Sequence, residues 1–181
     1  LGAVDLGHHQ RHIRLHAKEA GLIDDDRPLS GRRRRKILAD IRPRRKEGDD
    51  YPARLYVAFQ YDARNATLWE RTGYGAYKLI YGDYPPKHVI NYIWDNRLPK
   101  GTAIDNAYTD RAKMIAVESG AEHVGRWVFE ERNLYADYKR LFAAEPPRIA
   151  GIALMTDTDT TGESAVAYYD DIVLRSVKSE G

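Results

Sequence analysis

The chain has 181 residues, of which 43% are hydrophobic, and it carries a formal net charge of +2 at pH 7. This length and hydrophobic share suit one domain, and no apolar run approaches the roughly 18 residues of a membrane helix. Because the chain contains no cysteine, disulfides, thiol catalysis and cysteine-based zinc sites are excluded, whereas the compartment is left open.

Residues 1–36 differ in composition from the rest of the chain. All 19 aromatic residues follow position 50, and the first 50 residues carry +4 while the remainder carries −2. We therefore expect residues 1–36 to be a basic segment that is either poorly ordered or not native coding sequence, although residues 4–13 are able to form an edge strand. Since the chain starts at Leu1 without a signal-peptide pattern, we also expect a fragment or a processed product.

A run of five basic residues at 32–36 raises the question of nucleic-acid binding. Such sites normally combine charge with aromatic stacking or with an ordered helix. This segment has no aromatic residue, and acidic residues interrupt its charge. We therefore do not expect the protein to bind nucleic acid.

Beyond residue 50, segments rich in β-branched and aromatic residues alternate with Gly, Pro, Asn and Asp, as is typical of strands separated by turns. The predicted strands are residues 54–61, 75–81, 88–94, 114–118, 127–130, 149–155 and 165–177. The apolar run at 114–118 is expected to be a central strand, with 127–130 as its hairpin partner.

Residues 133–144 are the single helical candidate, with Asn133 as the N-cap. The helical spacing is carried by Leu134, Tyr138, Leu141 and Phe142. Strands outnumber helices, and hairpin-length spacings dominate. The predicted fold is mostly β, an antiparallel β-sandwich of the jelly-roll type with one short helix, formed by residues 37–178.

Tyrosines provide the candidate ligand-binding surface, because six aromatic residues crowd into positions 74–94. Tyr74, Tyr77 and Tyr84 flank Gly or Pro and are expected to be exposed, where an aromatic face with a polar edge suits a sugar ring. The aromatic residues expected to be mostly buried are Tyr56, Tyr92, Trp94 and Trp127.

An acidic loop beginning at residue 157 provides the candidate metal site. Carboxylates at alternate positions, a threonine oxygen and a glycine for the sharp turn match the first half of a calcium-binding loop, which the next strand would complete. The candidate ligands are Asp157, Asp159, Thr161, Asp170 and Asp171. The interpretation we prefer is an Asx-turn hairpin without an ion, and a structural calcium is the alternative.

Glu118 and Glu130 are candidates for paired acid–base catalysis, because they lie on neighbouring predicted strands. Glycosidases require two carboxyl groups about 5 to 9.5 Å apart. The preferred interpretation is simpler, since the same glutamates suit solvent-facing ion pairs with Arg126 and Arg132. His88 and His123 lack the spacing of a zinc site or of a nucleophile–base pair.

Four stretches occur in the order found in one bacterial family. They are GDDYPARLYV at 48–57, NYIW at 91–94, residues 127–138, and MTDTD at 155–159. Over about residues 47–174 the chain therefore resembles the family catalogued as domain of unknown function 3047. The resemblance implies a periplasmic or secreted protein, since such relatives commonly carry export signals, and it implies no activity.

The segment YYDDIVL at 168–174 also resembles the closing strand of galactose-binding-like jelly rolls, which include carbohydrate-binding modules. Together these observations predict an extracytoplasmic β-sandwich that binds a glycan or another polar ligand without catalysis. Two alternatives stay open: a carboxylate-dependent glycoside hydrolase or polysaccharide lyase, and a structural or partner-binding envelope protein. The ligand and the oligomeric state are not predicted.

Overall fold

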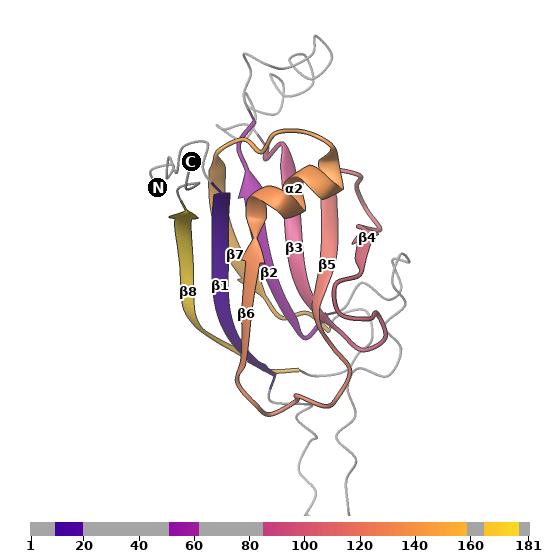
Figure 1. Ribbon diagram of the computed structural model, residues 1–181. Coiled ribbons are helices and arrows are strands. Elements are labelled where there is room, and N and C mark those ends of the chain that lie inside the picture. Colours follow the sequence, from indigo (N-terminus) through magenta and orange to yellow (C-terminus); the bar gives the residue numbers. More distant parts are fainter. Residues whose placement is uncertain (1–9, 20–50, 62–84, 159–164, 178–181) are drawn as a thin grey trace, which may run out of the picture.

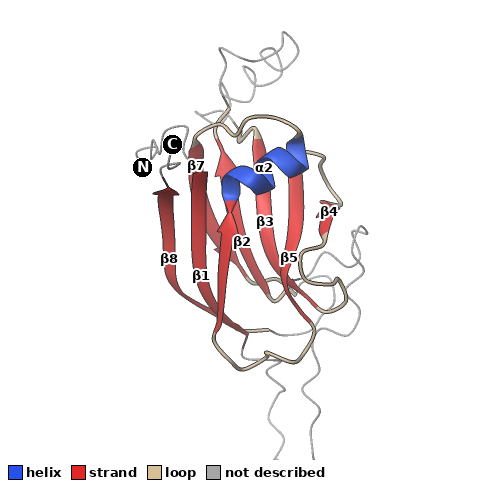
Figure 2. Ribbon diagram, in the orientation of Figure 1, coloured by secondary structure: helices blue, strands red, loops and turns tan. Residues whose placement is uncertain are grey.

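The computed structural model describes residues 10–19, 51–61, 85–158 and 165–177. In this part of the chain, eight strands and one helix follow one another (Figures 1 and 2). The elements are β1 (Gln10–Glu19), β2 (Ala53–Phe59), β3 (His88–Asp95), β4 (Ala103–Asp105), β5 (Ala112–Ser119), β6 (Val128–Asn133), α2 (Leu134–Phe142), β7 (Ile149–Met155) and β8 (Ala167–Val177). The prediction of a mostly β protein with one short helix is confirmed.

The strands form two sheets. One has three strands in the order β6-β1-β8, and the other has five in the order β4-β5-β3-β2-β7. The three-stranded sheet lies across one face of the larger sheet, with α2 beside it (Figure 1). All described strand pairs are antiparallel except β3 and β5, which are parallel.

The largest of the buried hydrophobic clusters lies between the two sheets. Every second residue of β2, namely Leu55, Val57 and Phe59, is buried in one cluster with residues of β3, β5 and α2. Tyr169 and Leu174 of β8 pack against this cluster from the other sheet. Because alternate residues of a strand face opposite sides, this period-two pattern fixes the face of β2 that meets the core.

The predicted hairpin between residues 114–118 and 127–130 is wrong. Strand β5 is flanked by β3 on one side and β4 on the other, so neither of its edges is available to β6. Strand β6 instead pairs with β1 in the other sheet. The short β4 returns antiparallel along β5, and this excursion supplies the crossover that the parallel β3–β5 pair requires.

Strand β1 comes from the segment that the sequence sets apart as 1–36. It occupies the centre of the three-stranded sheet and pairs with both β6 and β8. The edge strand expected at residues 4–13 overlaps it only at 10–13. The predicted strand at 75–81 lies outside the described residues, and the jelly-roll connectivity stays a prediction.

Helix α2 begins where expected. The Asn133 side chain accepts a hydrogen bond from the backbone N–H of Ala136 at 3.0 Å, as an N-cap does. Asp137 accepts two hydrogen bonds from the Arg132 guanidinium and one from the hydroxyl of Tyr92 in β3. The helix is therefore tied both to the strand before it and to the five-stranded sheet.

Candidate functional site

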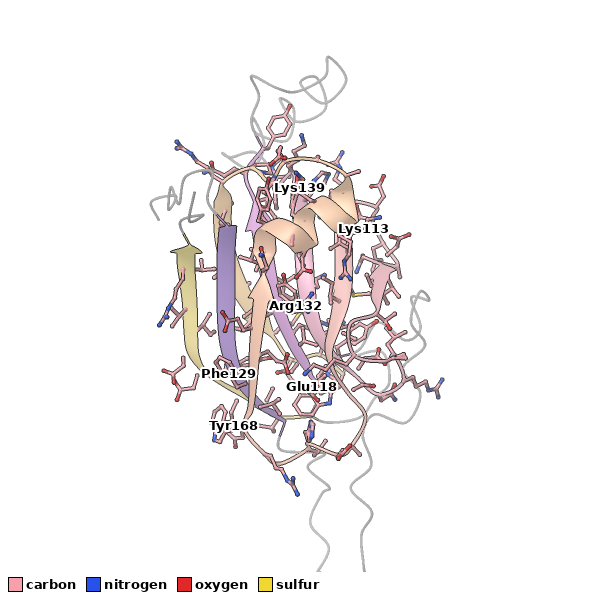
Figure 3. The ribbon with its side chains drawn as sticks, in the orientation of Figure 1. Lys113, Glu118, Phe129, Arg132, Lys139 and Tyr168 are labelled. Carbon is pink, nitrogen blue, oxygen red and sulfur yellow. The ribbon has the colours of Figure 1, made fainter. Side chains whose placement is uncertain are left out.

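Three large aromatic side chains are exposed on or beside the three-stranded sheet. Trp127 is 53% exposed, Phe129 52% and Tyr168 51%. Phe129 lies in β6 and Tyr168 lies in β8 (Figure 3). Trp127 immediately precedes β6. We call these three residues the aromatic strip. The prediction that Trp127 is mostly buried is wrong.

Strand alternation explains why the aromatic strip faces outward. In β6, Val128 packs against a core cluster and Glu130 is buried, so Phe129 between them takes the opposite face. In β8, Tyr169 packs into the core, and Tyr168 before it is therefore exposed. The outer face of the sheet thus presents aromatic residues from both of its edge strands.

Strand β1 separates the two sides of the aromatic strip. Its His16 is the Cα partner of both Phe129 and Asp170, and its Lys18 is the partner of Tyr168. Two strand spacings, or about 10 Å, separate β6 from β8. The aromatic strip therefore spans the full width of the sheet.

A second candidate site lies between the sheets, where two glutamates meet one lysine. Lys100 Nζ lies 2.8 Å from Glu118 Oε1 and 2.5 Å from Glu130 Oε1. Glu118 comes from β5 and Glu130 from β6, and both are buried. The preferred interpretation of these glutamates as solvent-facing partners of Arg126 and Arg132 is therefore wrong, and the structure brings the two glutamates together.

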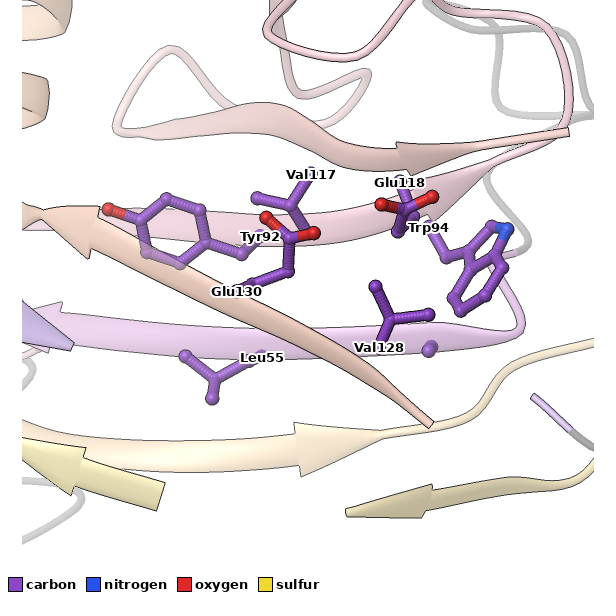
Figure 4. A pocket seen from close by; sticks show the side chains of 8 residues that line it. Leu55, Tyr92, Trp94, Val117, Glu118, Val128 and Glu130 are labelled. Atoms are coloured by element: carbon purple, nitrogen blue, oxygen red, sulfur yellow. The ribbon is translucent and has the colours of Figure 1, made fainter. Parts of the chain in front are cut away.

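A β-bulge aims Glu118 into the space between the sheets. The register of β3 against β5 shifts between Ile93 and Trp94, which leaves Val117 without a partner in β3. Bulges redirect the side chain that follows them. Val117 and Glu118 consequently line the same cavity, although strict alternation would place them on opposite faces (Figure 4).

The surroundings shift the pKa values of the two carboxyl groups in opposite directions. Burial raises the pKa of Glu118, but hydrogen bonds with Lys100 and His123 outweigh burial and leave this pKa lowered. Burial also raises the pKa of Glu130, and hydrogen bonding to Glu118 adds to it, so this pKa is raised despite Lys100. His123 Nδ1 lies 2.9 Å from Glu118 Oε2. We call Lys100, Glu118, His123 and Glu130 the acid centre.

The acid centre borders a cavity of about 20 Å³. Apart from the two glutamates, its lining comes from Ala53, Leu55, Tyr92, Trp94, Val117 and Val128 (Figure 4). This volume holds about one water molecule and no sugar ring. The acid centre can hold a proton and can link β5 to β6 through Lys100, but the cavity is too small for a glycan.

The family model described as "Protein of unknown function (DUF3047)" matches residues 33–173, which is well over half of the chain. The chain belongs to the DUF3047 family. The matched span includes the acid centre and the aromatic strip, so both are parts of the DUF3047 domain. No curated protein matches the chain, and no solved structure matches it. In the described ranges of this DUF3047 chain, no helix has the length and apolar character needed to cross a membrane.

The acidic residues predicted to bind calcium in this DUF3047 chain belong to different sheets. Asp157, just after β7, lies 3.4 Å from the buried Arg54 of β2. Asp170 and Asp171 are exposed in β8 of the smaller sheet, and Asp159 and Thr161 lie outside the described residues. Among the residues described, no three His, Asp or Glu side chains are grouped as for a metal ion. The calcium site stays a prediction.

The tyrosines predicted to bind a ligand, Tyr74, Tyr77 and Tyr84, lie outside the described residues. The aromatic strip is the surface that sequence reasoning missed. Its signal was present in the order Trp-Val-Phe-Glu at 127–130, where the two aromatic residues share one face of a strand. The prediction of a buried Trp127 follows from the general rule that aromatic residues of sandwiches are usually buried, and that rule does not consider which face of the strand the residue occupies.

Proposed function

We propose that this DUF3047 protein binds glycans without cleaving them, through the aromatic strip. The observation that carries this proposal is the exposure of Trp127, Phe129 and Tyr168, each by about half, on one sheet. Large aromatic side chains are costly to leave in water, and such surfaces commonly mark binding sites. A pyranose ring offers an apolar C–H face to an aromatic ring, while its hydroxyl groups stay available for hydrogen bonds.

The spacing of the aromatic strip supports an extended ligand. Trp127 and Phe129 are two residues apart, or about 7 Å along a strand, and Tyr168 lies two strands away, at about 10 Å. A single sugar ring does not cover such a platform, so an oligosaccharide or a polysaccharide is the better fit. Glu131 and Asp170 are exposed on the same sheet and are able to accept hydrogen bonds from sugar hydroxyls.

Catalysis at the acid centre is the second candidate. It is favoured by the opposite pKa shifts of Glu118 and Glu130, a pattern found in acid–base pairs. Against it, Lys100 already donates hydrogen bonds to both carboxyl groups, and the adjoining cavity has room for about one water molecule. We therefore propose binding in preference to hydrolysis or elimination.

An extracytoplasmic location belongs to this proposal and rests on the family resemblance. Cell fractionation of a bacterial host that makes the protein tests it. A bound calcium is a separate proposal, tested by calorimetric titration of calcium into chelator-treated protein. The ion pair between Asp157 and Arg54 makes that carboxylate a poorer calcium ligand, so we expect weak binding at most.

A glycan array followed by calorimetry on the best ligand tests the main proposal. We expect Trp127→Ala, Phe129→Ala and Tyr168→Ala each to weaken binding by about tenfold, since each removes one stacking face. Tyr108→Ala is the matched control, because Tyr108 is 58% exposed but lies near β4 and β5 of the other sheet. Absence of glycan binding, or equal loss in the control, would refute the proposal.

A further inference from the structure

Strand β7, at one edge of the five-stranded sheet, is apolar and exposed along nearly its whole length. Among the strands that the structure describes, it pairs only with β2. Its first residue, Ile149, is buried, and each of the six residues that follow is exposed. Three of these are large and apolar, namely Ile152, Leu154 and Met155, and each is exposed by more than a third. A strand with one covered face would alternate between buried and exposed residues, so both faces of β7 are accessible.

The outer edge of β7 is regular over most of its length. The register shift against β2 lies between Ile149 and Gly151, so residues 151–155 form an uninterrupted ladder with β2. A Cβ atom added at Gly151 would meet no other atom within 4 Å, which shows open space around the strand. Along such an edge, every second residue directs its backbone N–H and C=O away from the sheet. These groups are able to pair with one more strand.

The other three edges of the two described sheets are protected against such pairing. Strand β4 has only three residues, β6 carries three charged residues in a row, and β8 carries two adjacent aspartates and a register shift against β1. Short strands, charges and bulges are the means by which proteins prevent edge-to-edge association. Of the four edge strands described, β7 alone has no charged residue. This difference indicates that β7 serves as an interface.

We propose that β7 pairs antiparallel with β7 of a second copy of this chain, about a two-fold axis at Ala153. The two five-stranded sheets then form one continuous sheet. On one face, Ile152 of each copy lies opposite Leu154 of the other, which makes two large apolar pairs. On the other face, Met155 of each copy lies opposite Gly151 of the other and fills the open space there. The strand is therefore complementary to itself in size.

Charge also favours a second copy in antiparallel orientation. Residues 149–155 carry no charge, so self-pairing brings no like charges together within the strand. The nearest charged residues lie beyond its two ends, Arg148 before it and Asp157 after it. Antiparallel pairing brings Arg148 of each copy near Asp157 of the other, whereas parallel pairing would align like charges.

The state of association of the full chain tests this inference. A single strand pair is smaller than the standard interface of about 1,600 Å², so we expect a reversible dimer with a dissociation constant on the order of 10 µM. Sedimentation velocity from about 1 µM to about 200 µM should show a shift from monomer to dimer and no further growth, because a two-fold contact closes. A chain that stays monomeric at every concentration, or one that grows beyond a dimer, overturns the inference.

A charge at the axis tests the position of the contact. Ala153→Lys places two lysines opposite each other in the dimer and should raise the dissociation constant at least about tenfold. Ala153 is exposed, so the monomer should keep its stability, which urea unfolding at a concentration below dimerisation measures. The matched control is Ala136→Lys, at an exposed alanine of α2, and it should dimerise as the wild type does.

A mixture of two variants then tests whether the contact is with a second copy at the same residue. Ala153→Lys and Ala153→Glu should each dimerise poorly alone, and together they should form a heterodimer, because opposite charges meet at the axis. If folded Ala153→Lys dimerises as tightly as the wild type, or if mixing restores nothing, the self-pairing is wrong. Strand β7 and the aromatic strip belong to different sheets, so either result leaves the proposed glycan binding to its own test.

Discussion

At the scale of single residues, Glu118 and Glu130 show how surroundings separate two identical groups. Both are buried and both reach Lys100, but only Glu118 also contacts His123. The pKa of Glu118 is lowered and that of Glu130 is raised. Ionised Glu118 therefore stabilises the fold, whereas ionised Glu130 costs free energy because it is buried beside another carboxylate.

We predict that Glu118→Gln is clearly more destabilising than Glu130→Gln at pH 7. Removal of the Glu118 charge deprives Lys100 and His123 of an ionic partner, which should cost about 1 to 2 kcal/mol, since both partners are partly exposed. Gln at position 130 resembles the protonated acid and should cost less than about 0.5 kcal/mol. Urea unfolding measures both, and Glu131→Gln on the exposed face of β6 is the control. Equal costs would contradict this account.

The pH dependence of the same variant follows from the sign of the shift. The pKa of Glu130 is raised in the folded state. The stability that this shift contributes is therefore fully present below the unfolded pKa of about 4.3, and it is lost as pH rises through the folded pKa. The Glu130→Gln variant has no group at this position that can ionise, so it does not lose this stability. Its free energy of unfolding relative to that of the wild type should therefore increase from pH 4 upward. The same urea series repeated across that range should show this trend.

The sequence could name the two glutamates but not their arrangement. As a candidate pair they depend on a predicted hairpin between the strands that carry them, and that hairpin does not form. They meet because β6 crosses to the other sheet and a bulge at Val117 redirects Glu118. Lys100 could not be chosen from the sequence, since its approach depends on a loop fixed by the tertiary fold.

At the scale of elements, the local sequence predicts where the strands and the helix lie far better than it predicts which strands pair with one another. Strands β2, β3, β5, β7 and β8 lie where periodicity predicts, and α2 starts after its cap residue. Pairing depends on which edges remain available after other strands have docked, and no short window of sequence contains that information. The three-residue β4 was missed, yet it occupies the edge of β5 that would otherwise receive β6.

The cap of α2 offers a prediction at this scale. Asn133→Ala removes the acceptor of the Ala136 backbone N–H and should destabilise the protein by about 1 kcal/mol. Asn133→Asp keeps that acceptor and places a negative charge at the helix N-terminus, so it should cost much less. Thermal unfolding of both variants measures the difference. If Asn133→Asp destabilises the protein as much as Asn133→Ala does, the capping hydrogen bond is not the reason that Asn133 contributes to stability.

At the scale of the whole molecule, β1 determines whether residues 37–178 are a complete domain. The DUF3047 match begins at residue 33, after β1, and composition likewise sets residues 1–36 apart. Yet β1 is the centre of the three-stranded sheet, and β6 and β8 each pair with β1 rather than with each other. Without it, the described structure leaves both strands with unpaired backbone groups and uncovers one side of the core.

We therefore predict that a chain starting at residue 37 loses cooperative unfolding, whereas a chain starting at residue 10 keeps it. The shorter chain also lacks the strand that lies between the two sides of the aromatic strip, so the proposed glycan binding should disappear together with the fold. Circular dichroism across a urea gradient measures the first effect, and calorimetry with the polymer that the full chain binds measures the second. A chain of residues 37–181 that unfolds as cooperatively as the full chain would show that the smaller sheet does not depend on β1, and the face assigned to ligand binding would then have to be sought elsewhere.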